Sequence, residues 1–300
     1  MLKVAWAEDY AHPLPNNHRF PMIKYELLPE QLLYEGTLST SNIFGPTRVE
    51  ESLIMAAHSG HYWQKLKNLE LTKSEIRRTV FPLSKQLVDR ETLIMSGTIQ
   101  CAMFALKYGI SMNVAGGTHH AFSDRGEGFC LLNDIAVASY YLLNNGHVRK
   151  ILVVDLDVHQ GNGTAEIFKD ESRVFTFSMH GANNYPLHKE NSDLDIGLAD
   201  GTDDAFYLKT LEINLKNLLE RVEPEFIFFL SGVDVLATDK LGRLGLTLEG
   251  CKSRDKMVLD LAKENDIPLV ASMGGGYSED IKVIIEAHAN TYRLAQEIYF

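Results

Sequence analysis

Residues 151–163 have the sequence ILVVDLDVHQGNG, in which a short apolar run ends in aspartate, histidine and glycine residues. The run Ile151–Asp155 is continuous rather than alternating, which predicts a strand that is covered on both faces. Four other runs share this character: Ser111–Ala115, Val174–Ser178, Phe226–Ser231 and Pro268–Ser272. Strands of this kind are typical of parallel sheets between two layers of helices.

Longer segments with helical character separate these runs. They are Thr47–Asn68, Arg90–Tyr108, Asn133–Asn144, Asp203–Arg221, Thr247–Glu264 and Ser278–Gln296. The alternation predicts an α/β fold, a mostly parallel sheet with helices on both faces. Because no Pro/Gly/Ser-rich linker divides the chain, we expect one domain over residues 1–300. The first 45 residues contain Pro13, Pro15, Pro21 and Pro29 and are expected to be irregular and to wrap the surface.

The composition narrows the class of protein. The 300 residues include 29 basic and 40 acidic ones, a formal charge of −11, which argues against general nucleic-acid binding but is compatible with cationic partners. The three cysteines, Cys101, Cys130 and Cys251, form no CxxC motif and indicate a reducing compartment. Residues 1–10 lack the apolar core of a signal peptide, and no run is apolar enough for a membrane span. We therefore expect a cytoplasmic protein, a monomer or small homo-oligomer.

Polar residues and glycines follow each predicted strand. They form the stretches GGTHH at 116–120, DLDVHQG at 155–161, MHG at 179–181, GVD at 232–234 and MGGGY at 273–277. In open α/β sheets, ligands bind beyond the carboxyl ends of the strands, so a site is expected there.

Asp157 and His159 are two residues apart, so both side chains point the same way from a strand end. Together with Asp234 they form a candidate metal site, and two carboxylates with one imidazole leave coordination positions open for catalysis. A polar turn that caps the next helix is the structural alternative. Asp155 and the glycines at 161 and 163 favour the metal site.

His119 and His120 are candidates for proton transfer, because imidazole titrates near neutral pH. Tyr277 follows three glycines and can donate a hydrogen bond to a developing oxyanion. A dinucleotide or phosphate loop is disfavoured there because the GxGxxG spacing is absent. No GxSxG motif is present, and Cys130 is expected to be a buried thiol.

In combination, these motifs resemble the zinc-dependent histone deacetylase family, which shares its fold with arginase. The stretches that carry the resemblance are GGTHHAF at 116–122, GEGFCLLND at 126–134, DLDVHQGNGT at 155–164, SMH at 178–180, SGVDVLATDKLGRLGLT at 231–247 and GGGY at 274–277. The sequence NHRFPM at 17–22 and the QGNG stretch look most like the class IV branch and its bacterial relatives.

The resemblance implies roles for single residues. Asp157, His159 and Asp234 match the zinc ligands, with ferrous iron as an alternative metal. His120 matches the general base, His119 its electrostatic partner oriented by Asp155, and Tyr277 the residue that stabilises the oxyanion.

Further matches concern substrate, product and potassium. Gly128, Phe129 and Gly275 match substrate-binding positions, Tyr185 is the candidate for the opposite tunnel wall, and Arg19 matches the arginine of the internal product channel. A structural K⁺ is implied near Asp155, Asp157, His159, Ser178 and Met179, and a second near Phe168, Glu171 and Val174.

One position departs from the main class I pattern, which has Asp where this chain has Asn162. An amide stabilises an imidazolium less than a carboxylate does, so we expect His120 to be less basic. Class IV members share this asparagine.

The implied function is metal-dependent hydrolysis of N-acyl-lysine amides in proteins or peptides, by an activated water with His120 as base. An amidohydrolase acting on acylated small amines such as acetylpolyamines is the first alternative. A non-catalytic acyl-lysine binding scaffold is a second. The function of a ureohydrolase with two manganese ions is disfavoured, because this sequence lacks the extra acidic residues that a second metal needs. The length of the acyl group stays open between acetyl and the long acyl groups that class IV relatives prefer.

Overall fold

Eight parallel strands form one sheet in the order β2-β1-β3-β8-β7-β4-β5-β6. The computed structural model describes residues 1–300. The strands are β1 (Lys3–Ala5), β2 (Ile43–Phe44), β3 (Ile110–Asn113), β4 (Ile151–Asp155), β5 (Val174–Gly181), β6 (Leu194–Leu198), β7 (Phe226–Leu230) and β8 (Leu269–Ser272). All five predicted strands are present, and the predicted parallel sheet is confirmed.

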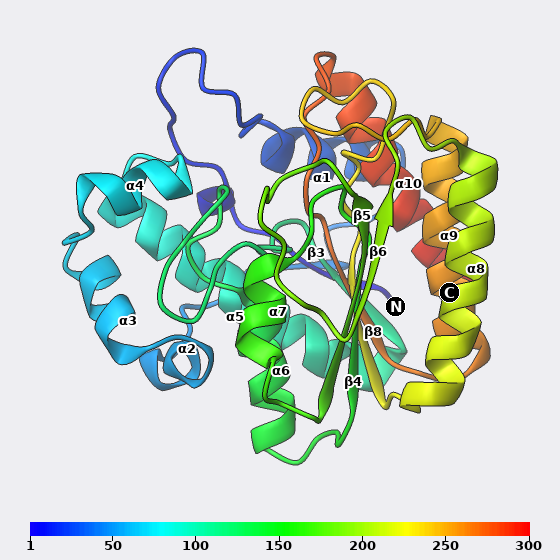
Figure 1. The fold of residues 1–300 in the computed structure, drawn as a ribbon, viewed down its shortest axis with the longest axis horizontal. Helices are drawn as coiled ribbons and strands as arrows, with labels where there is room; N and C mark the ends of the chain where they lie inside the picture. Colours follow the sequence, from blue (N-terminus) through cyan, green and yellow to red (C-terminus); the bar gives the residue numbers. More distant parts are fainter.

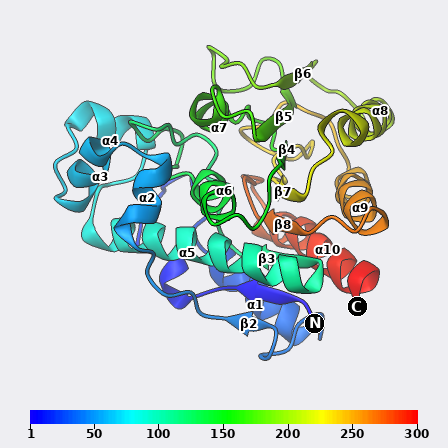
Figure 2. The same cartoon turned by 90° about the horizontal axis from the view of Figure 1, so that it is seen from below.

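Helices cover both faces of this sheet, as predicted (Figure 1). The α-helices are α1 (Lys24–Tyr34), α2 (Glu51–Ala57), α3 (Gly60–Lys67), α4 (Lys73–Thr79), α5 (Lys85–Tyr108), α6 (Asp134–Asn144), α7 (Asn162–Phe168), α8 (Asp204–Val222), α9 (Leu248–Glu264) and α10 (Ile281–Tyr299), and a short 3₁₀ helix spans Glu8–Tyr10. Figure 2 shows α5, α6 and α7 on one side of the sheet and α8, α9 and α10 on the other. None of these helices combines the length and the apolar character that crossing a bilayer needs.

The expectation that the first 45 residues are irregular was wrong. They supply β1 and β2 at one edge of the sheet and helix α1, which packs against α10. Pro29 lies inside α1 and has no N–H for the carbonyl of Tyr25, four residues earlier. The indole N–H of Trp6 donates to that carbonyl instead, at 2.8 Å, so the helix continues through the proline.

The predicted helix over Thr47–Asn68 is two helices. Helix α2 ends at Ala57, and α3 begins after Ser59, whose hydroxyl accepts a hydrogen bond from the N–H of Tyr62. A side-chain cap of this kind starts a new helix rather than continuing the old one. Helices α4 and α7 and strand β6 were not predicted, although Thr72 and Glu75 form a capping box at the start of α4.

The sheet order brings the functional loops together. Asp155, the last residue of β4, lies opposite Ser178 of β5 and Leu230 of β7. Since all strands run in the same direction, the loops that follow β3, β4, β5, β7 and β8 all emerge at the carboxyl ends of the strands. A continuous cluster of 81 buried apolar residues holds the strands and helices together beneath this edge.

Candidate active site

Asp157, His159 and Asp234 converge at the carboxyl edge of the sheet. The first two follow β4 and the third follows β7, and these strands are neighbours. The Nδ1 atom of His159 lies 3.0 Å from Oδ1 of Asp157 and 3.1 Å from Oδ2 of Asp234. One ligand atom from each residue lies within 4.8 Å of the others, and all three residues are buried.

Backbone amides hold the two carboxylates in place. The N–H of Val158 donates to Oδ1 of Asp234 at 2.9 Å, and the N–H of Gly275 donates to Oδ2 of Asp157 at 2.8 Å. A Cβ atom on residue 275 would overlap with the carboxylate oxygens of both aspartates. The glycine is therefore required for the close approach of the backbone to the cluster.

The electrostatics of this cluster fit a bound cation. Burial and the neighbouring Asp157 carboxylate raise the pKa of Asp234 to about 7. Burial favours a neutral His159, but its hydrogen bonds to Asp157 and Asp234 raise its pKa to about 10. Two carboxylates crowded together out of water need a positive charge between them. Two oxygen donors and one nitrogen donor with open positions suit a divalent transition metal such as zinc.

The two histidines of the GGTHH stretch lie beside the cluster, with ring centroids 4.1 Å apart. His119 donates from Nδ1 to Oδ2 of Asp155 at 2.7 Å, and His120 donates from Nδ1 to Oδ1 of Asn162 at 2.7 Å. Burial favours a neutral His119, but Asp155 and Asp157 raise its pKa. Burial, His119 and His159 lower the pKa of His120 well below its usual value. His120 is therefore the neutral member of the pair, with Nε2 free to accept a proton.

Tyr277 lies on the other side of the cluster. Its ring centroid is 6.4 Å from that of His159, and its backbone N–H donates to Oδ2 of Asp239 at 2.6 Å. Burial and the carboxylates of Asp234 and Asp157 raise the pKa of its phenol well above the usual value. The phenol therefore stays protonated at neutral pH and can donate a hydrogen bond.

Lys24 supports the loop that carries Tyr277. The lysine is fully buried in α1, and its Nζ donates to the carbonyl of Gly274 at 3.1 Å. It lies 5.6 Å from the centroid of the Tyr277 ring, and burial lowers its pKa to about 8. Nothing in the sequence around Lys24 marked it as part of the site.

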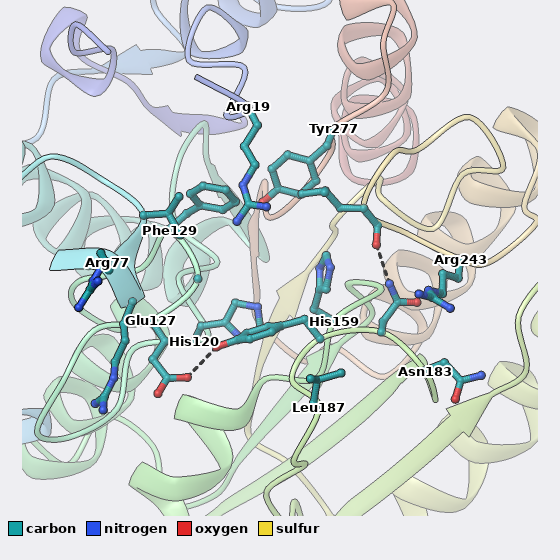
Figure 3. A pocket seen from close by; sticks show the side chains of 16 residues that line it. Arg19, Arg77, His120, Glu127, Phe129, His159, Asn183, Leu187, Arg243 and Tyr277 are labelled. Carbon is teal, nitrogen blue, oxygen red and sulfur yellow. Dashed lines mark hydrogen bonds between the residues drawn. The ribbon is translucent and has the colours of Figure 1, made fainter. Parts of the chain in front are cut away.

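An open pocket of about 560 Å³ leads from the surface to His120, His159 and Tyr277 (Figure 3). Gly128, Phe129 and Tyr185, to which the resemblance gave substrate positions, are among its lining residues, and their contact with a substrate stays a prediction. The Tyr185 hydroxyl donates to Oε2 of Glu127 at 2.7 Å, which orients its ring edge-on to His120. Glu127 belongs to the GEGFCLLND stretch, but the sequence assigned it no role, and only the folded chain shows its contact with Tyr185.

A second cavity, of about 40 Å³, lies behind the cluster and includes Gly275 in its lining. The predicted place of Arg19 in an internal channel was wrong: Arg19 is exposed, lines the outer pocket and stacks 5.2 Å from the Phe129 ring. Phe20 takes the inner position, because its apolar ring packs against Phe129 at 5.1 Å. The arginine of the inner cavity is Arg90 of α5, which donates to the carbonyl of Tyr10 at 2.6 Å.

The predicted potassium positions fall into two groups. Asp155, Ser178 and Met179 lie where β4 and β5 are paired, close in sequence to Asp157 and His159 of the same group. Phe168 ends α7 and Val174 begins β5. The N–H of Glu171 donates to the carbonyl of Phe168, and the carbonyl of Glu171 accepts from the N–H of Val174. Binding of K⁺ at either place stays a prediction.

Known proteins match both the sequence and the fold. The family model of the histone deacetylase domain matches residues 17–292. An uncharacterised protein of Picosynechococcus sp. is 40% identical over 296 residues, which cover 99% of each chain. Histone deacetylase 2 of Arabidopsis thaliana is 29% identical, over 92% of this chain and 74% of that protein.

Among solved structures, a histone deacetylase homologue from Aquifex aeolicus superimposes with a TM-score of 0.82. The superposition covers 98% of this chain and 82% of that one, at 24% sequence identity, and supports the predicted arginase/deacetylase fold. The family match extends over all the motifs described above. The chain therefore belongs to the histone deacetylase family, a family of hydrolases.

Proposed function

We propose that this protein is a metal-dependent lysine deacylase, in which Asp157, His159 and Asp234 hold zinc or ferrous iron. One observation carries the proposal: the buried Asp-His-Asp cluster lies between a neutral His120 and a protonated Tyr277, at the base of an open pocket. A divalent metal at such a site lowers the pKa of a water molecule and polarises a carbonyl group.

The residues of the chain then have separate tasks. His120 accepts the proton of the attacking water at Nε2, because its Nδ1 is already committed to Asn162. The Tyr277 phenol donates a hydrogen bond to the oxygen that becomes negative as the carbonyl carbon turns tetrahedral. His120 returns the proton to the leaving lysine amine. His119, held by Asp155, is the charged neighbour that keeps His120 neutral.

The size of the inner cavity favours a short acyl group. The lysine side chain enters through the outer pocket, and the acyl group extends past the cluster toward the inner cavity. A volume of about 40 Å³ is small beside that of the outer pocket, about 560 Å³. The methyl of an acetyl group makes the smallest demand on this space, whereas a decanoyl chain needs far more of it.

Three further inferences concern the domain, the branch of the family and the location of the protein. We infer that residues 1–300 form one catalytic domain, because the eight strands share one sheet and one core. The Asn162 contact and the NHRFPM stretch support a class IV-like branch. The three free, buried cysteines support a cytoplasmic location.

An acyl-length series tests the proposal. Lysine peptides that carry acetyl, butyryl, decanoyl and myristoyl groups are compared for kcat/KM, with metal content measured in the same preparation. We expect acetyl-lysine to be the best substrate of metal-loaded protein. No hydrolysis of any member by metal-loaded protein would contradict the proposed function, and faster hydrolysis of the decanoyl peptide would contradict only the acyl length.

A further inference from the structure

The entrance of the outer pocket is basic, although the chain as a whole has a formal charge of −11. Four of the 16 lining residues are arginines, namely Arg19, Arg77, Arg78 and Arg243. Glu127 is the one acidic residue of the lining, and its carboxylate is already bound by Arg125 at 3.0 Å and by the Tyr185 hydroxyl. The charge at the entrance therefore has the opposite sign to that of the protein.

These arginines are available to a ligand. Arg19, Arg77 and Arg78 are exposed and form no ion pair within the chain, and Arg243 contacts the partly exposed Asp200 at 3.3 Å. Figure 3 shows Arg77, Arg19 and Arg243 on three different sides of the pocket. Anionic groups on either side of a bound acyl-lysine would thus meet a guanidinium.

The backbone fixes the position of the Arg77–Arg78 pair. Both residues lie in the last turn of α4, and Val80 ends the helix with a positive φ of 63°. The N–H groups of Gly128 and Phe129 donate to the carbonyls of Arg78 and Thr79, each at 3.0 Å. The arginine-bearing turn is therefore attached directly to the wall of the pocket that Phe129 forms.

An acyl-lysine side chain is neutral, so the charge at the entrance acts on the groups that flank it. Charges within about 8 Å of one another interact at physiological ionic strength before salt screens them. Guanidinium groups bind carboxylates and phosphates through paired hydrogen bonds. An acetylpolyamine keeps its remaining ammonium groups and would bring positive charge to a positive entrance.

We propose that the entrance selects acyl-lysine in acidic sequence, with Asp or Glu on both sides of the modified lysine, and disfavours acetylpolyamines. The selection rests on the proposed deacylase function for its catalytic consequence. The overall charge is compatible with cationic partners, whereas the charge at the entrance favours anionic ones.

The test uses three acetyl-lysine peptides of equal length, flanked on both sides by Asp, Ser or Lys, together with N-acetylspermidine. In about 50 mM salt we expect kcat/KM to fall in the order Asp, Ser, Lys, by about tenfold in all, with acetylspermidine no better than the Lys peptide. In about 500 mM salt the range should narrow to about threefold or less.

Three variants separate the effect of the entrance arginines from that of the overall charge. Arg77→Gln/Arg78→Gln should reduce the Asp-to-Lys ratio at least threefold, and Arg243→Gln alone should reduce it less. The control Arg149→Gln/Arg173→Gln also removes two positive charges, but just before β4 and β5, at the amino ends of the strands. It should keep the wild-type ratio. Thermal melts check that each variant is folded.

Affinity measurements keep this test independent of catalysis. Fluorescence anisotropy of the same labelled peptides should give the same charge order. Equal or reversed preference in wild type, or an equal loss of preference in the control variant, would overturn the proposed selection. Charge-ordered binding without hydrolysis by metal-loaded protein would overturn the deacylase function and leave the selection intact.

Discussion

The Nδ1 atom of His120 donates a hydrogen bond to the amide oxygen of Asn162, 2.7 Å away. An amide in this place leaves the imidazolium form of His120 without a facing carboxylate, and burial already lowers its pKa well below the usual value. In the proposed mechanism, the strength of His120 as a base is therefore set in part by Asn162.

Replacing Asn162 by Asp should move the acidic limb of the pH–kcat/KM profile to higher pH by about one unit or more. A carboxylate stabilises the protonated imidazole and so raises the pKa of His120. Since the base must be neutral to accept a proton, activity is then lost at a higher pH than in wild type. Asn183→Asp is the matched control, because it adds the same charge to the pocket lining without contacting His120. An unmoved acidic limb in Asn162→Asp would remove His120 from the role of base.

Tyr277→Phe should keep the bound metal and lower kcat by about 10²–10³-fold, the effect of removing one oxyanion donor. The phenol is protonated because burial and two carboxylates raise its pKa. Tyr185→Phe is the control, since that hydroxyl binds Glu127 and should affect kcat much less. Turnover of Tyr277→Phe near the wild-type level would exclude the phenol from the reaction.

Removal of metal by a chelator should lower the melting temperature of wild-type protein by roughly 5 °C or more. A metal held by Asp157, His159 and Asp234 would bind only the folded chain, which brings these residues together, so its removal takes that binding free energy from the folded state. Asp234→Asn removes one of these ligands, so its melting temperature should not respond to the chelator. The rim variant Asp200→Asn should keep the full response. A wild-type melting temperature that ignores the chelator would speak against a metal at this cluster.

Ile94→Ala should broaden the acyl range toward butyryl and hexanoyl groups relative to acetyl. Ile94 is fully buried and lines the inner cavity, so its truncation enlarges the space beyond the cluster. Ile99→Ala, on the same helix but outside the cavity lining, should cost a similar 2–5 kcal/mol or so of stability. The prediction fails if both variants keep the wild-type acyl preference.

The sequence predicts which residues gather at the candidate site better than it predicts what surrounds them. Asp157, His159 and Asp234 could be found because buried parallel strands form continuous apolar runs, and polar residues that end such runs share one edge of the sheet. Strands β4 and β7 are far apart in the sequence, and only the folded chain shows that they are neighbours in the sheet.

Features that depend on packing could not be predicted. Helix α1 passes through Pro29 because Trp6, far away in the sequence, supplies the missing donor. Arg90 and Lys24 occupy ordinary helical positions, and only the folded chain places one in the inner cavity and the other beneath Tyr277. The sequence likewise does not show that the Arg77–Arg78 pair lies at the pocket, because its position depends on the hydrogen bonds that attach α4 to the pocket wall.

The most direct test of the central claim is elemental analysis of the purified protein combined with acetyl-lysine peptide hydrolysis by the same sample. The three-ligand cluster predicts about one equivalent of transition metal per chain. Hydrolysis should disappear on chelation and return when Zn²⁺ or Fe²⁺ is added. Hydrolysis that persists in metal-free protein, or its absence from protein loaded with one equivalent of either metal, would contradict the claim.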